Sequence, residues 1–174
     1  MYFKEVEIPE GVNVEILGKK VKVSGPKGNL EREFKIKEDI KIEKKENKLI
    51  VSSESERRKI KALVGTIAAH IRNMVKGVTK GFTYKLKVVF THFPVKVKVE
   101  DDKVLIENFL GERVPRVAKR VEGVEIQVKG QDIILTGIDI EKVGLMASRL
   151  EQACRITGKD RRVFQDGIWI VGRE

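Results

Sequence analysis

The stretch IKALVGTIAAHIRNMVKG, residues 60–77, decides the fold of this chain. Its apolar side chains recur three and four residues apart, which places them on one face of a helix. They are Ile60, Leu63, Val64, Ile67, Ala68, Ile71, Met74 and Val75. We expect a helix here, with Ser53 or Ser55 as its N-cap and Gly77 at its end. Because only one face is apolar, the helix must pack that face against another element.

The residues before this helix alternate apolar and polar, which is the pattern of strands with one buried face. We expect a hairpin, a strand at 30–36 and a second hairpin. The apolar positions are Val12, Val14, Ile16, Val21 and Val23 in the first hairpin, and Ile40, Ile42, Leu49 and Val51 in the second. Gly25-Pro26-Lys27-Gly28 interrupts the alternation with residues suited to a tight turn.

The second half of the chain repeats this order at an offset of 83 or 84 residues. Val95, Val97 and Val99 match the first strand, and Val143, Met146, Ala147, Leu150 and Cys154 match the helix. Gly111 matches Gly28 at the same offset. A shared order of strand, turn and helix indicates a duplicated domain, although generic β-β-α patterning can imitate one.

The predicted fold class is therefore α+β, in two tandem copies of one domain, each an antiparallel sheet with one main helix on a face. We place the domains at residues 1–82 and 83–174, and the second copy carries a basic C-terminal extension. The join near 77–83 has none of the length or the Ser and Pro content of a flexible linker. This predicts two domains in a fixed relation.

The charge balance points to a polyanionic partner. The net charge is +10 and the sequence pI is about 9.7. Residues 83–174 contain eight Arg, whereas residues 1–82 contain four. The Lys of the first half alternate with Glu along the strands, which is typical of a solvated face.

The basic residues gather most densely after the second helix. Four of the eight residues from Arg155 to Arg162 are basic and one is acidic. Arg155, Lys159, Arg161 and Arg162 are candidate phosphate ligands, because a guanidinium offers a planar fork of donors. The alternative is a solvated turn that only keeps the protein soluble. We expect Phe164 and Trp169 to pack back onto the second domain and hold this loop, although Trp169 could instead stack on bases.

No group of residues supports catalysis or a cofactor. The lone His70 and His92 have no second ligand nearby, and the turn at Lys27 lacks the spacing of a phosphate-binding loop. Cys154 lies on the apolar side of the second helix and is expected to be a buried thiol in a reducing, cytoplasmic setting. No apolar run is long enough to span a membrane and no signal peptide is expected.

Four segments carry a resemblance to a known family. They are NMVKGVTKGF (73–82), THFP (91–94), NFLGE (108–112) and DRRVFQDGI (160–168). Together they resemble the large-subunit ribosomal protein L6 family in its archaeal and eukaryotic form, and the turn at Gly25–Gly28 is similar to a turn of that family. The resemblance covers the whole chain.

The resemblance implies a structural, non-enzymatic protein of the large ribosomal subunit. Its C-terminal domain is expected to make most contacts with large-subunit rRNA, close to the sarcin-ricin loop and the factor-binding region. Neighbouring ribosomal proteins, with translation factors nearby, are the other expected partners, and no membrane is expected. Carried over, the resemblance puts Lys159, Arg161 and Arg162 on RNA, and Lys27, Arg113, Arg116 and Arg155 complete the expected set. The alternative is a free-standing RNA-binding or chaperone module outside the ribosome.

Overall fold

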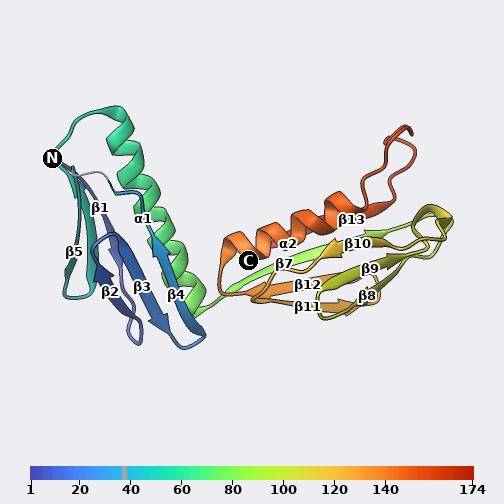
Figure 1. Ribbon diagram of the computed structural model, residues 1–174, viewed down its shortest axis with the longest axis horizontal. Helices are drawn as coiled ribbons and strands as arrows, with labels where there is room; N and C mark the ends of the chain where they lie inside the picture. Colours follow the sequence, from blue (N-terminus) through green and yellow to red (C-terminus); the bar gives the residue numbers. More distant parts are fainter. Residues whose placement is uncertain (37–38) are drawn as a thin grey trace. The chain divides into compact units, whose positions relative to one another are not determined.

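The computed structural model describes residues 1–36 and 39–174, and it divides into two compact units, Met1–Gly81 and Phe82–Glu174. Phe82, which the sequence analysis assigned to the first domain, begins the first strand of unit 2. No helix in the part of the chain described is long and apolar enough to cross a membrane. Figure 1 shows both units as a helix beside antiparallel strands.

Unit 1 contains two antiparallel sheets, with strand orders β1-β6-β5 and β2-β3-β4. Its helix, α1, packs against β1, β6 and β3, and the core between them includes Val21, Leu49, Val64 and Ile71. The elements are β1 (Tyr2–Glu7), β2 (Asn13–Leu17), β3 (Lys20–Gly25), β4 (Gly28–Glu33), β5 (Ile40–Lys45), β6 (Lys48–Ser53) and α1 (Arg58–Thr79).

Unit 2 repeats this arrangement and adds one strand. Its sheets have the orders β11-β12-β7-β13 and β10-β9-β8, and α2 packs against β7, β10, β12 and β13. The elements are β7 (Phe82–Val89), β8 (Lys96–Val99), β9 (Lys103–Glu107), the short 3-10 helix η1 (Phe109–Gly111), β10 (Arg116–Lys119), β11 (Val124–Lys129), β12 (Asp132–Gly137), α2 (Ile140–Ala153) and β13 (Gly167–Arg173).

The duplication is confirmed by strand order. In sequence, β1-β6-β5 corresponds to β7-β12-β11, and β2-β3-β4 corresponds to β8-β9-β10. The helices also match, because Ile60, Val64, Ile67 and Ile71 are buried in α1 and their predicted equivalents are buried in unit 2. The added strand β13 pairs with the edge of β7 that its equivalent β1 leaves open in unit 1.

Three local predictions are wrong. The match of Gly111 to Gly28 fails because Leu30 faces Val23 whereas Arg116 faces Ile106, so the longer β9–β10 connection has shifted the alignment. The N-cap of α1 is Arg57, with no side-chain cap hydrogen bond. Ser53 is instead the last residue of β6, and the Ser55 hydroxyl accepts from the N–H of Arg57, one residue before the helix begins.

The helix also passes through Gly77 and ends at Thr79, two residues later than predicted. The N–H of Gly81 donates to the carbonyl of Lys76 at 3.2 Å, and Gly81 has a φ of +74°. A left-handed glycine is a common way for a helix to stop, since it has no Cβ to clash.

Candidate nucleic-acid interface

The basic loop occupies residues 155–166, between α2 and β13 of unit 2. Its tip is a turn around Asp160, whose carboxylate accepts a hydrogen bond from the N–H of Arg162 at 3.0 Å and whose carbonyl accepts one from the N–H of Phe164 at 2.9 Å. The Asp160 carboxylate also accepts from the Arg162 guanidinium at 3.2 and 3.0 Å. These bonds lower the pKa of Asp160, and they organise the turn.

Both ends of the loop are fastened to the body of unit 2. The buried side chains of Ile156 and Ile168 belong to its core. Asp166 is also buried, and its Oδ1 accepts a hydrogen bond from the hydroxyl of Thr91 at 3.3 Å. Beyond it, the N–H of Ile170 donates to the carboxylate of Glu151 on α2 at 3.0 Å. The loop is therefore presented by buried anchors.

The two aromatic residues next to the loop lie at the surface. Trp169 is 42% exposed and Phe164 is 38% exposed. Neither side chain is buried in the core, contrary to the expectation that both pack back onto the second domain. The indole N–H of Trp169 donates to the carbonyl of Gln165 at 3.2 Å, and the ring covers Gly167 so closely that a Cβ there would lie 3.2 Å from it. Trp169 holds the end of the loop by this contact, and Gly167 faces the indole.

Two further loops lie at the same end of unit 2 as the basic loop (Figure 1). One connects β7 to β8 and supplies Thr91, the partner of Asp166. The other connects β9 to β10, and its Asn108 donates through Nδ2 to the carbonyl of Pro94 at 3.0 Å. Gly111 of this loop lies against the Phe93 ring, where a Cβ would come within 3.0 Å of the ring. We call this region, made of residues 90–95, 108–115 and 155–166, the loop end of unit 2.

Arg116 braces the loop end from inside the unit. Its guanidinium pairs with both carboxylate oxygens of Glu112, at 2.9 and 2.7 Å, and donates to the carbonyls of Ala153 and Arg155, at 3.1 and 2.9 Å. It also lies over the Phe109 ring, 4.6 Å from the centroid. The hydrogen bonds from Arg116 hold the pKa of Glu112 below its usual value. This side chain is engaged within the protein.

Other cations of the loop end face solvent. The side chains of Arg113, Arg155 and Arg161 are exposed, and none of them has an ion-pair or hydrogen-bond partner among the residues that the structure describes. Lys159 is exposed as well, with its ammonium 4.6 Å from the centroid of the Phe164 ring. Arg162 is shared with Asp160. Unpaired guanidinium groups can donate hydrogen bonds to phosphate oxygens without breaking an existing ion pair.

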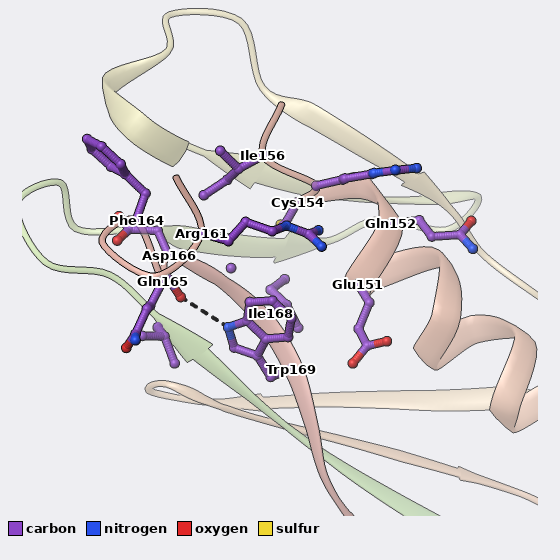
Figure 2. Close-up of a pocket in the computed structure, with 13 residues that line it drawn as sticks. Glu151, Gln152, Cys154, Ile156, Arg161, Phe164, Gln165, Asp166, Ile168 and Trp169 are labelled. Carbon is purple, nitrogen blue, oxygen red and sulfur yellow. Dashed lines mark hydrogen bonds between the residues drawn. The ribbon is translucent and has the colours of Figure 1, made fainter. Parts of the chain in front are cut away.

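A cavity of about 600 Å³ lies between the basic loop, the end of α2 and β13. Figure 2 shows Arg161 pointing from the loop across this cavity, and Trp169 with its hydrogen bond to Gln165. Arg155, Gln152 and Glu151 also line it.

Comparison with known proteins assigns the family. The model of the family described as Ribosomal protein L6 matches residues 8–81 and again residues 93–167, so it matches each unit once. The chain belongs to the ribosomal protein L6 family.

Archaeal relatives in the L6 family match almost the whole chain. The protein of Ignicoccus hospitalis named Large ribosomal subunit protein uL6 is 54% identical over 173 residues, which cover 97% of this chain and 93% of the relative. Proteins of the same name from Aeropyrum pernix and Sulfurisphaera tokodaii are 52% and 51% identical, over 98% and 99% of this chain and 94% and 92% of the relatives. The L6 family is structural and non-enzymatic, which agrees with the sequence analysis.

Lys27, which the sequence analysis added to the RNA-binding set, lies in unit 1. Its ammonium donates to the carbonyl of Lys80 at 2.7 Å, and its N–H donates to the carbonyl of Val78 at 2.9 Å. A cation there interacts favourably with the negative end of the α1 dipole. In this L6-family chain the glycine-proline turn thus covers the C-terminus of α1.

Sequence reasoning found the basic loop and missed what supports it. The brace from Arg116 to the end of α2 joins residues that are far apart in the chain, so no local pattern announces it. The same applies to the contact of the β7–β8 loop with Asp166. The contact of Trp169 with the end of the loop is local in the sequence. Gln165, which accepts its hydrogen bond, precedes it by four residues, and Gly167 leaves room for the ring.

Proposed function

We propose that this chain is a structural component of the large ribosomal subunit, located in the cytoplasm, that binds rRNA through the loop end of unit 2. The observation that carries the proposal is the group of exposed cations, Arg113, Arg155, Lys159 and Arg161, on loops held by buried anchors. The names of the archaeal relatives support the ribosomal part of it. Such a surface binds folded RNA mainly by neutralising phosphates and by fitting its shape.

The proposal extends to the surroundings of the site. The family resemblance supports a position near the sarcin-ricin loop and the factor-binding region, with translation factors nearby and other large-subunit proteins as neighbours. Arg113 joins the surface from the β9–β10 loop, whereas Arg116 supports it from within. Arg162 supports the surface by holding the turn at Asp160. Lys27 lies in unit 1, where it covers the C-terminus of α1.

Sedimentation tests the location. In an extract of the source cells, the protein should be found almost entirely in the large-subunit peak. A protein found mainly in the unbound fraction would instead support a free-standing RNA-binding module and contradict the proposal.

Salt dependence tests the surface. A variant with Arg155, Lys159 and Arg161 changed to Gln should bind large-subunit rRNA with a slope of log affinity against log salt that is smaller by roughly two to three, at about 0.7–0.9 per phosphate neutralised. The matched control changes Arg57, Arg58 and Lys59 to Gln, because these exposed residues at the start of α1 have the same composition and charge. A control that reduced the slope equally would show that total charge, and not the loop end, carries binding.

A further inference from the structure

We infer that the cavity beside the basic loop receives one unpaired base of the bound RNA, which stacks on Trp169 while Arg155 and Arg161 hold its phosphate. This inference rests on the proposed function and adds a base-binding site to a surface otherwise argued from phosphates alone. The cavity of about 600 Å³ is built within unit 2. Its volume lies within the range of roughly 300–1,000 Å³ typical of small-ligand sites.

Trp169 has the features of a stacking platform. Its indole N–H is fixed to the carbonyl of Gln165 at 3.2 Å, and part of the ring rests on Gly167. The residue nevertheless remains 42% exposed and lines the cavity. Aromatic rings that are held in place and left partly open to solvent are the groups on which unpaired bases stack, whatever their identity.

The cavity also offers groups that suit the polar edge of a base. Gln152 uses its amide N–H to donate to the Ser148 hydroxyl at 3.3 Å, and Gln165 uses its own to donate to the carbonyl of Arg162 at 3.4 Å. Each of these bonds leaves the side-chain carbonyl oxygen able to accept. One carboxylate oxygen of Glu151 accepts from the N–H of Ile170, and its second oxygen can accept as well. These acceptors match the amino and imino groups of a base.

The charges at the cavity favour a nucleotide over an apolar peptide side chain. Arg155 and Arg161 both line the cavity and are exposed. Within the described ranges 1–36 and 39–174, neither guanidinium has an ion-pair or hydrogen-bond partner. A phosphate attached to the stacked base would give them one, since guanidinium groups bind phosphate oxygens bidentately. An apolar side chain in the same place would leave both without one.

The experiment compares two ligands with the same backbone charge. The full-length protein is titrated with a single-stranded RNA of about six nucleotides, a length within the usual site sizes for such strands, and with a ribose-phosphate oligomer of equal length that has no bases. Trp169 is the sole tryptophan of the chain, so its fluorescence reports directly on the cavity. We expect the RNA to quench this fluorescence saturably and to bind about 5- to 150-fold more tightly than the oligomer without bases, as stacking of one base provides.

Two variants locate the effect. Trp169→Leu, followed by polarisation of labelled RNA, should bring the two affinities close together. Phe3→Leu is the matched control, because Phe3 is 53% exposed on β1 of unit 1, outside the loop end, and does not line the cavity. It should preserve the preference for RNA with bases. Circular dichroism melting checks that both variants fold, and the wild-type comparison stands without either variant.

The outcomes separate this inference from the proposed function. Equal affinity for the two oligomers, binding without quenching, or no binding of either would overturn the base-binding site. The salt slope measured on large-subunit rRNA decides the proposed function independently. A steep slope that is lost with Arg155, Lys159 and Arg161 would then leave a surface that contacts phosphates only.

Discussion

At the scale of single residues, Arg113 in the loop end and Arg116 at the start of β10 have different roles, although they lie only three residues apart in the chain. Arg116 is half-buried between Glu112, Phe109 and the carbonyls at the end of α2, whereas Arg113 is exposed without an ion-pair partner among the described residues. The sequence suggested RNA contact for both. What separates them is the partner that folding brings to Arg116.

This difference gives a stability prediction. Arg116→Gln should lower the free energy of unfolding by roughly 1.5–3 kcal/mol, because it removes charged hydrogen bonds that join the β9–β10 loop to α2. Arg113→Gln, the matched control, should change it by less than about 0.5 kcal/mol. Urea denaturation of both variants measures the effect, and equal values would contradict the assigned brace.

Cys154 supplies a prediction on pH. Burial raises the pKa of its thiol from the ordinary value of 9.0 to about 12, although the Arg116 guanidinium opposes the shift. Because the folded state keeps the thiol proton up to a higher pH than the unfolded state does, the stabilisation is complete below pH 9 and is lost as the pH rises toward 12. Between pH 8 and 10 the loss due to Cys154 should be about 1.4 kcal/mol, the equivalent of one pH unit.

Measuring unfolding of the parent and of Cys154→Ala at both pH values isolates this contribution, since Lys and Tyr side chains titrate alike in the two proteins. The stability difference between parent and variant should shrink by that amount at the higher pH. A difference that stays constant would mean that the thiol titrates normally.

At the scale of elements, apolar periodicity in the sequence predicted most of the fold but missed two strands, β1 and β7. Both helices and most hairpin strands followed from apolar spacing. β1 was missed because among its residues only Val6 is buried, so no alternation is visible. β7 was missed despite a visible alternation at Phe82, Leu86 and Val88, because its first residues were assigned to the join between the domains.

The close approach of the glycine-proline turn to α1 is an element-scale feature that a mutation can test. A Cβ on Gly25 would lie 2.7 Å from the Val78 side chain and 2.9 Å from its carbonyl oxygen. Gly25→Ala should therefore lower the free energy of unfolding by roughly 1–3 kcal/mol, since the backbone of the helix end must shift.

Gly65, in the middle of α1, provides the opposite control. A Cβ there would meet nothing within 4 Å. Gly65→Ala should raise the free energy of unfolding by about 0.5–1 kcal/mol, because alanine loses less backbone entropy in a helix. Thermal melts of the two variants should shift in opposite directions, and a Gly25→Ala protein as stable as its parent would disprove the close contact.

At the scale of the whole molecule, the duplication accounts for the scaffold, and the departures from it account for the candidate site. The longer β9–β10 connection, the basic loop and β13 occur in unit 2 and are absent from the corresponding described part of unit 1. The first two of these additions supply Arg113, Arg155, Lys159 and Arg161. The sequence revealed the repeat through its offset, but the way in which the additions meet depends on contacts between distant loops.

Because each unit has its own core, each should fold alone. The buried residues from Val6 to Val78 form one cluster and those from Phe82 to Ile168 form another. Cutting between Gly81 and Phe82 preserves the bond from Lys27 to Lys80 in unit 1 and that from the N–H of Thr83 to the carbonyl of Glu174 in unit 2. Chains of this size can bury enough apolar surface to be stable without help from another domain.

We therefore expect fragments 1–81 and 82–174 each to unfold cooperatively in urea, and the second fragment to keep most of the salt slope for large-subunit rRNA. The first fragment should bind rRNA weakly and without preference, because it lacks the loop end and its charges are mostly Lys alternating with Glu. Titrations of both fragments beside the full chain measure this, with far-ultraviolet circular dichroism confirming their folding. If fragment 82–174 were folded and yet lost its slope while fragment 1–81 retained it, the binding surface would have to be assigned to unit 1.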